Sequence, residues 1–251
     1  MMAHAPRAGR VRQRSGDPAG DAREQGAGTS VLIADDHPLV LHGLRILLED
    51  AGIATIYEAR DAVSAHHAFD RFHPQVVVTD LSFEDRGLSG LSLIERIRAH
   101  DRRARILVFS MHTDPVVIAR AVESGAIGYV FKDAPAATFH AAFDAVRGGC
   151  AYLDHDVATR LAFFNLTKHQ VPATRLNNRE LEIFALLGQG ISKHNIATKL
   201  SINYKTVVSH CSSMRQKLEL ATDKDLLRIA IEQGLISDLN MPARQKPTEA
   251  R

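Results

Sequence analysis

The chain has 251 residues, enough for two modest domains, and its 45% hydrophobic and 24% charged content is ordinary for a soluble globular protein. The two cysteines, Cys150 and Cys211, stand alone and far apart, which argues against a disulfide scaffold or a zinc site. No apolar run approaches the length of a membrane span, and a net charge of +2 is too small to indicate nucleic-acid binding by itself.

Both ends of the chain have the composition of solvated tails. Residues 1–29 are rich in Gly, Ala, Arg and Pro and contain no apolar segment, so we expect a disordered basic tail and not a secretory signal. Residues 241–251 are expected to form a flexible C-terminal tail.

Between residues 30 and 148, short apolar runs alternate with helical patterns. Repeated βα units of this length predict an α/β fold with a doubly wound five-stranded parallel sheet. Strands are expected at 31–34, 55–57, 76–78, 105–109 and 128–131, and helices through 39–48 and at 61–72, 89–100, 115–124 and 135–148.

Polar side chains follow four of the five expected strands. Asp80 ends the run at 76–78, whose unbroken apolar pattern is typical of a strand buried on both faces. Because the carboxyl ends of parallel strands meet at one edge of an open sheet, Asp80 is expected to lie in a ligand-binding crevice. The same edge receives residues from the first, fourth and fifth strands: Asp35, Asp36, Ser110 and Lys132.

This combination of side chains suits the chemistry of phosphate. Three carboxylates at one place repel each other unless a hard cation such as Mg²⁺ neutralises them through oxygen ligands. A hydroxyl and an ammonium group suit phosphoryl oxygens, and a carboxylate can itself accept phosphate as an acyl phosphate. Each residue alone is more often structural, but their joint placement predicts a metal-assisted phosphoryl acceptor.

Residues 31 to about 148 resemble the receiver domain of bacterial two-component response regulators. The matching stretches are Ile33–Pro38, Val78–Leu81, Phe109–Ser110 and Gly125–Asp133. The resemblance implies that a sensor histidine kinase phosphorylates Asp80. It also implies that Mg²⁺ is held by Asp35, Asp36, Asp80 and the carbonyl of Ser82.

Three further roles are implied by the same resemblance. Ser110 and Lys132 would engage the phosphoryl group, and Tyr129 would change rotamer on activation. From the residues alone, Tyr129 is equally a half-buried strand residue. One segment departs from the family: residues 81–90 lack the usual Met-Pro-Gly turn and are about two residues longer, so we expect altered phosphorylation kinetics with the same acceptor.

Residues 149–174 are expected to form a linker. Gly148 and Gly149 end the preceding helix, since glycine readily takes the left-handed conformation at a helix C-terminus. A short helix is expected at 156–164, and a more polar stretch follows it.

Residues 175–240 are expected to form four short amphipathic helices. Asn177 and Glu180 predict a capping box that opens the first helix, and Ser192 and Asn203 cap the second and third. The third helix presents basic and hydroxyl side chains after a short turn, as in a recognition helix that lies in a major groove. The module is nearly neutral, so on composition alone a solvated helix face is the alternative.

The stretches Leu176–Glu180, Gly190–Lys193 and Ile202–Val207 resemble the LuxR/FixJ-type helix-turn-helix domain, and the resemblance covers nearly the whole module. It implies that two copies pair through the fourth helix over a roughly palindromic site on double-stranded DNA. Lys205, Val208 and Ser209 would face bases or nearby backbone. The residues implied to contact mainly phosphates, or to lie beside the DNA, are Thr206, His210, Lys217 and Lys193.

Together these features predict a cytoplasmic, dimeric transcriptional response regulator of the LuxR/FixJ (NarL-like) class that is switched by phosphorylation of Asp80 and has neither enzymatic activity nor membrane contact. One alternative is a LuxR-type transcription factor whose receiver works independently of phosphorylation. Another is a phosphatase that forms an aspartyl phosphate. That chemistry needs a second acid close to the nucleophile, and Ser82 stands two residues on, which disfavours it.

Overall fold

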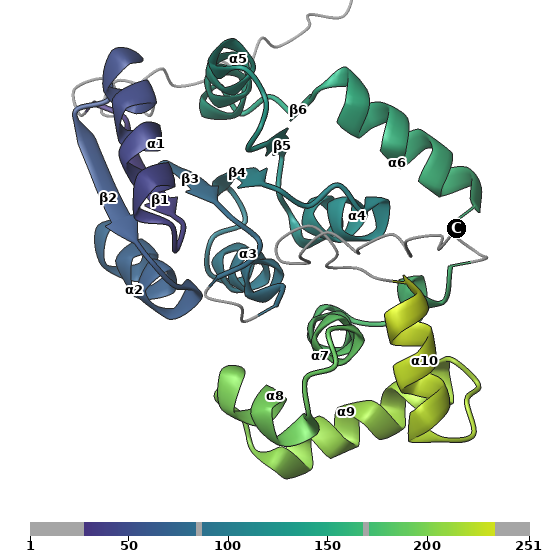
Figure 1. Cartoon of the computed structure of the whole chain (residues 1–251). Coiled ribbons are helices and arrows are strands. Elements are labelled where there is room, and N and C mark those ends of the chain that lie inside the picture. The colour runs from purple at the N-terminus through teal and green to yellow at the C-terminus, as the bar shows by residue number, and fades with distance from the viewer. Residues whose placement is uncertain (1–27, 84–86, 168–170, 234–251) are drawn as a thin grey trace, which may run out of the picture.

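The computed structural model describes residues 28–83, 87–167 and 171–233 (Figure 1). The expected tails at 1–29 and 241–251 lie outside these ranges, apart from residues 28 and 29. The described part divides into an α/β unit, which we define as residues 30–167, and a helical unit, residues 172–233. No helix in the described ranges is both long enough and apolar enough to cross a membrane.

A parallel sheet forms the centre of the α/β unit, and the predicted fold class is confirmed. The strand order is β2-β1-β3-β4-β5-β6, so the order reverses at β1 and β3, and the carboxyl ends of these two strands lie side by side. The strands are β1 (Ser30–Ala34), β2 (Thr55–Ala59), β3 (Val76–Thr79), β4 (Arg105–Ser110), β5 (Gly128–Phe131) and β6 (Tyr152–Leu153).

Helices cover both faces of the sheet, because successive strand residues point to opposite sides. Val31 and Ile33 pack with α1 and α5 on one face, whereas Leu32 and Val77 pack with α2, α3 and α4 on the other (Figure 1). The helices are α1 (Pro38–Asp50), α2 (Ala62–Phe72), α3 (Ser89–His100), α4 (Pro115–Ser124) and α5 (Ala136–Arg147), close to the ranges predicted from periodicity.

The segment expected to be a linker adds to the α/β unit instead. β6 extends the five predicted strands to six by pairing with β5, and the Tyr152 amide donates to the Ile127 carbonyl over 2.9 Å. The free edge of β5 offers these hydrogen bonds, and two residues are too few to show a strand pattern in a sequence. α6 (His155–Thr167) is longer than the expected helix at 156–164 and packs on α4.

The helical unit forms from short helices with the predicted caps. Asn177 and Glu180 make a reciprocal capping box, the Ser192 hydroxyl accepts from the Asn195 amide, and the Asn203 side chain accepts from the Lys205 amide. The elements are the 3-10 helix η2 (Pro172–Arg175), α7 (Asn178–Gly188), α8 (Lys193–Lys199), α9 (Tyr204–Lys217) and α10 (Asp223–Gln233).

α7 is the helix of the helical unit that faces the α/β unit (Figure 1). It packs against α8, α9 and α10 on one side and against α3 of the α/β unit on the other. Two polar contacts from α4 reinforce the junction. The Arg120 guanidinium donates to the carbonyls of Thr174 and Leu176 over 2.6 and 2.5 Å, and the Asn178 side-chain amide donates to the Ser124 hydroxyl over 2.7 Å.

The first turn of α3 lies directly on the strand end at Asp80. The Gly90 amide donates to the Leu81 carbonyl over 2.9 Å. A Cβ atom at Gly90 would lie 2.5 Å from the Leu81 Cα and would collide with the Asp80 carbonyl oxygen. This close approach of two backbones requires glycine.

Gly90→Ala is therefore expected to destabilise the protein by about 1–3 kcal/mol, because the added methyl group forces α3 away from β3. Gly43→Ala is the matched control, since Gly43 also lies within a helix but has open space around it. That change should stabilise by about 0.5–1 kcal/mol. Urea unfolding followed by circular dichroism measures both, and a Gly90→Ala protein as stable as the wild type would contradict the packing.

Candidate functional site

The carboxyl ends of β1, β3, β4 and β5 bring four of the predicted residues together. Lys132 Nζ lies 2.6 Å from an oxygen of Asp35 and 2.6 Å from Asp80 Oδ2. The other oxygen of Asp80, Oδ1, accepts hydrogen bonds from the Ser110 hydroxyl and the Leu81 amide, each over 2.6 Å. Asp35, Asp80 and Ser110 are buried. Each oxygen of the Asp80 carboxylate is therefore held by a donor from a different element.

Burial sets the electrostatics of this pocket. Removal from solvent raises the pKa of Asp35, and the Asp80 charge adds to this effect although Lys132 opposes it. Removal from solvent also lowers the pKa of Lys132, but Asp80 and Asp35 together outweigh that effect and raise it overall. One ammonium group thus faces two buried carboxylates, and the remaining negative charge favours a cation.

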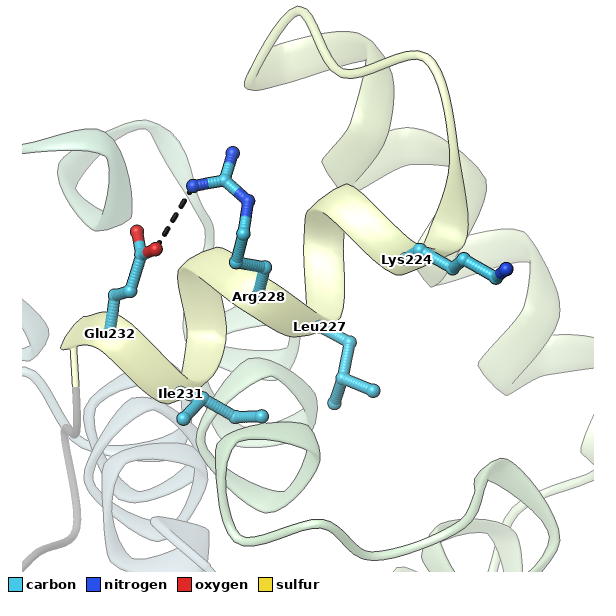
Figure 2. Close-up of a pocket in the computed structure, with 5 residues that line it drawn as sticks. All are labelled: Lys224, Leu227, Arg228, Ile231 and Glu232. Atoms are coloured by element: carbon cyan, nitrogen blue, oxygen red, sulfur yellow. Dashed lines mark hydrogen bonds and ion pairs between the residues drawn. The ribbon is translucent and has the colours of Figure 1, made fainter.

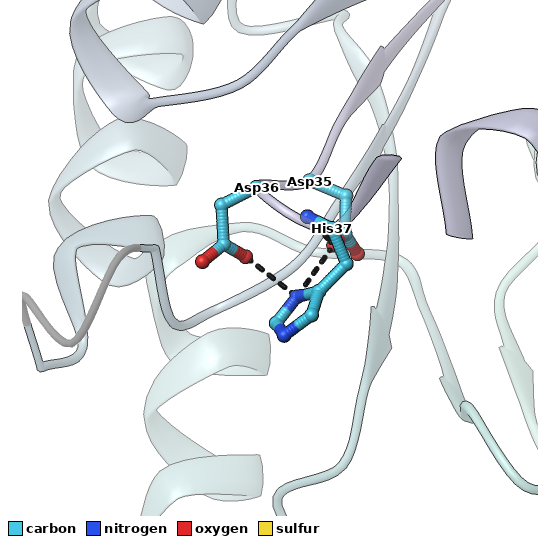
Figure 3. A group of neighbouring side chains, drawn as sticks. All are labelled: Asp35, Asp36 and His37. Carbon is cyan, nitrogen blue, oxygen red and sulfur yellow. Dashed lines mark hydrogen bonds and ion pairs between the residues drawn. The ribbon is translucent and has the colours of Figure 1, made fainter. Parts of the chain in front are cut away.

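The oxygen donors for such a cation lie at the end of β1 (Figure 3). His37 Nδ1 lies 3.2 Å from Asp35 Oδ1 and 2.8 Å from Asp36 Oδ1, so the imidazole bridges the two carboxylates. The possible ligand atoms of these three residues lie within 4.8 Å of one another. Carboxylate oxygens are the donors that Mg²⁺ prefers, so this chemistry fits the predicted metal. The sequence analysis did not single out His37, although it directly follows the Asp-Asp pair.

Ser82 and Tyr129 meet at a residue that the sequence analysis missed. The Ser82 hydroxyl lies 2.7 Å from His112 Nε2, and the Tyr129 hydroxyl donates to the His112 backbone carbonyl over 2.8 Å. Tyr129 is fully buried, and burial raises the pKa of its hydroxyl above the ordinary value. His112 follows β4 in a loop, where no periodic pattern marks it. His112 therefore joins Ser82, in the loop after Asp80, to the predicted switch residue Tyr129.

The outer face of α9 presents an open polar surface. Lys205, Thr206, Val208 and Ser209 are all exposed, whereas Val207, Cys211 and Met214 point into the core of the helical unit. α9 packs against α7, α8 and α10. The structure therefore groups these four predicted DNA contacts on one exposed surface.

Two predicted DNA contacts lie elsewhere and are engaged in ion pairs. Lys193 at the start of α8 lies 2.5 Å from Asp223, and Lys217 at the end of α9 lies 2.6 Å from Glu180. His210 is half-buried on α9, and burial lowers the pKa of its imidazole. Any phosphate contact from these two lysines competes with a carboxylate of the same chain.

α10 carries exposed apolar side chains. Leu227 is 39% exposed and Ile231 is 56% exposed, although Leu226 and Ala230 on the same helix are buried. Figure 2 shows Leu227 and Ile231 projecting from the same side of α10, where they line an open pocket together with Lys224, Arg228 and Glu232. The surface has an apolar centre with a charged border.

Glu180 ties the start of α7 to the end of α9. Burial by itself would raise the pKa of its carboxyl group, but hydrogen bonds from Lys217, the Asn177 amide and Ser213 outweigh burial and hold the pKa below its ordinary value. The ionised form therefore stabilises the helical unit. That stabilisation is present at neutral pH and is lost as the pH falls through the lowered pKa.

Glu180→Gln is expected to lower the free energy of unfolding by about 1–3 kcal/mol at pH 7, because charge-assisted hydrogen bonds are lost. The difference from the wild type should shrink as the pH falls from the ordinary pKa of a Glu side chain, about 4.3, through the lowered pKa of Glu180, because the wild-type carboxylate then becomes protonated as well. Glu232→Gln is the control, since its ion pair with Arg228 is exposed. Urea titrations at several pH values measure both variants, and a pH-independent difference would contradict this assignment.

Comparisons with known proteins match both units of the chain to known domain families. A family model described as the response regulator receiver domain matches residues 31–144, and one described as bacterial regulatory proteins, luxR family, matches residues 174–230. The methanol utilization control regulatory protein MoxX of Paracoccus denitrificans is 36% identical over 197 residues, which is 78% of this chain and 88% of MoxX. The response regulator UvrY of Escherichia coli is 31% identical, over 82% of this chain and 95% of UvrY.

A solved structure extends the likeness to three dimensions. RcsB from Salmonella enterica serovar Typhimurium, bound to promoter rprA in the presence of the phosphomimetic BeF₃⁻, superposes with a TM-score of 0.60 and 27% identity, over 82% of this chain and 99% of RcsB. The chain therefore belongs to the LuxR family of bacterial response regulators and is a transcriptional regulator that joins a receiver domain to a LuxR-type DNA-binding domain.

Proposed function

We propose that a sensor histidine kinase phosphorylates Asp80 and that this modification controls how the regulator binds DNA. The observation that carries the proposal is the placement of donors on Asp80. Ser110 and Leu81 hold one carboxylate oxygen and Lys132 holds the other, each within 2.6 Å. The same donors are suited to the oxygens of a transferred phosphoryl group.

In the proposed transfer, the N–P bond of the kinase's phosphohistidine breaks and an O–P bond to Asp80 forms. Asp35, Asp36, Asp80 and the carbonyl of Ser82 would hold a Mg²⁺ ion, which would supply neutralising charge at the phosphoryl oxygens. Lys132 keeps its ammonium charge because of the carboxylates around it and adds a second positive charge.

The contacts around Ser110 suggest how Ser110 and Tyr129 would respond to phosphorylation. When its hydroxyl turns to the phosphoryl group, it leaves Asp80 Oδ1 and alters the loop in which the His112 amide lies 3.5 Å from Ser110 Oγ. Tyr129, held by the His112 carbonyl, changes rotamer with this loop. Three contacts thus link the state of Asp80 to the buried Tyr129 side chain.

α9 is proposed to lie in the major groove of double-stranded DNA, with Lys205, Val208 and Ser209 toward bases or nearby backbone. Thr206, His210 and Lys217 would mainly contact phosphates, and Lys193 would also contact the DNA. Homodimers are proposed to form through α10, whose exposed apolar centre suits a second copy of the same helix. RcsB, which is 28% identical to this chain, has been solved bound to DNA, in one case as two dimers on two parallel DNAs, and this supports DNA binding by a dimer.

One observation favours a second candidate, a regulator that binds DNA without phosphorylation. The segment after Asp80 is longer than usual in the family, and its described residues Leu81, Phe83 and Leu88 are completely buried. Close packing of these three side chains beside Asp80 would hinder the approach of a kinase. The same experiment separates the two candidates.

Incubation with acetyl phosphate and Mg²⁺ is expected to add about 80 Da to the intact mass of the wild type, the mass of one phosphoryl group on a carboxylate. Asp80→Asn should show no adduct, and a chelator should abolish the adduct on the wild type. If the wild type stays unmodified with acetyl phosphate and with candidate kinases, the phosphorylation-independent regulator is the better account.

Lys205→Ala is expected to weaken binding to a DNA fragment selected from a random-sequence pool by about 1 kcal/mol, roughly fivefold, because a cation is lost from the exposed face of α9. Arg103→Ala, which removes an exposed cation from the α/β unit, is the control and should leave affinity unchanged. Fluorescence anisotropy at a fixed salt concentration measures both. Equal DNA affinities for the two variants would contradict the proposed contact between α9 and the DNA.

A further inference from the structure

We propose that the receiver holds the DNA-binding domain by α7 and not by the recognition helix α9, and that the contact between Gly87 and α7 transmits the state of Asp80. The regulatory half of this inference rests on the proposed phosphorylation. The docking half rests on the contacts alone. Four observations carry it.

The acceptor and the start of α3 are joined by a short chain of hydrogen bonds. The Leu81 amide donates to Asp80 Oδ1 over 2.6 Å, and the Leu81 carbonyl accepts from the Gly90 amide over 2.9 Å. Because Gly90 has no room even for a Cβ atom, the first turn of α3 cannot slide over this strand end. A shift of the Leu81 backbone therefore moves the first turn of α3 with it.

The residues just before α3 lie directly on α7. Gly87 has a φ of 72°, and a Cβ atom built on it would lie 3.2 Å from Leu186 Cγ and 3.4 Å from Glu182 Cγ. Leu88, the next residue, is completely buried. The backbone of the receiver thus touches α7 with no side chain of its own in between.

α7 has the burial of a helix covered on all sides. Nine of its residues are buried, among them the charged Glu182 and the polar Asn178. Short surface helices usually keep one polar face in solvent, so a second covering element is needed. α3 supplies it, and Arg96 on α3 and Arg179 on α7 both place positive charge near the Glu182 carboxylate.

The docking leaves the DNA-reading surface open. Tyr204 and Val208 on α9 are 49% and 39% exposed, and Leu227 and Ile231 on α10 are exposed as well. The receiver therefore does not regulate by covering α9. It fixes where the DNA-binding domain sits, and phosphorylation releases α7 when the donors on Asp80 Oδ1 turn to the phosphoryl group.

The test compares two glycines with the same backbone conformation. Gly87→Ala puts a methyl group against Leu186, whereas Gly52→Ala, at a φ of 78°, puts one into open space. Both variants place an alanine in the left-handed backbone conformation and carry the same strain. A difference between their properties therefore reports the contact with α7. Leu186→Ala removes the facing atoms, and combining it with Gly87→Ala forms a double-mutant cycle.

For unphosphorylated protein, Gly87→Ala is expected to increase the radius of gyration in small-angle X-ray scattering, and Gly52→Ala to leave it unchanged. The effect of phosphorylation on DNA affinity should fall by about fivefold or more in Gly87→Ala, with the phosphoryl adduct on Asp80 retained. Adding Leu186→Ala to Gly87→Ala should restore part of the compact radius of gyration and part of the effect of phosphorylation on DNA affinity. If Gly87→Ala and Gly52→Ala give the same result in both measurements, the inference is overturned.

The readouts separate this inference from the proposed function. If the wild type takes no phosphoryl adduct, the proposed switch fails, and the radius of gyration of Gly87→Ala against Gly52→Ala still decides the docking. If Gly87→Ala does not fold, Leu186→Ala alone removes the same contact from the side of α7. A compact Leu186→Ala protein with full phosphorylation dependence would then overturn the inference.

Discussion

The ammonium group of Lys132, placed 2.6 Å from Asp35 and 2.6 Å from Asp80, is the interaction on which the site depends. Two buried carboxylates at one edge of a sheet are unstable unless a positive charge lies between them. Lys132 supplies that charge from the end of β5, and Ser110 from β4 fixes the remaining oxygen of Asp80. The pocket still carries excess negative charge, which is the condition for binding a divalent cation and then a phosphoryl group.

The second constraint is the burial of α7 between two units. A LuxR-type domain with four short helices has a small core of its own, and α7 completes that core while its other side packs on α3. Arg120 and Ser124 on α4 add hydrogen bonds to the same junction. Gly90 contacts the backbone beside Asp80 and Gly87 faces Leu186 on α7, so a short series of contacts joins the proposed phosphorylation site to the helical unit.

Local patterns in the sequence predicted most of the architecture. Apolar runs located five strands within about two residues at either end, and Asn177, Ser192 and Asn203 marked three helix starts that the structure confirms. The convergence of Asp35, Asp80, Ser110 and Lys132 also followed, because strand order in a parallel sheet determines which residues share an edge.

Long-range contacts escaped the same reasoning. β6 is two residues long and forms only because β5 offers a free edge, so no pattern of its own predicted it. The role of His112 could not be predicted, because Ser82 and Tyr129, which contact it, come from distant parts of the chain. Lys193 and Lys217 were predicted to contact DNA, and nothing in the sequence pointed to their carboxylate partners, which lie 30 and 37 residues away. The contact of Gly87 with α7 depends on how two domains pack, which neither domain's sequence shows alone.

The most direct test of this account is amide hydrogen exchange of α7 in the full-length protein, before and after phosphorylation with acetyl phosphate and Mg²⁺. The account predicts that α7 and the first turn of α3 exchange faster once Asp80 is phosphorylated, because the receiver releases the helix it covers. The same segments in Asp80→Asn should not respond. Unchanged protection of α7 in a protein whose mass shows complete phosphorylation would contradict the account.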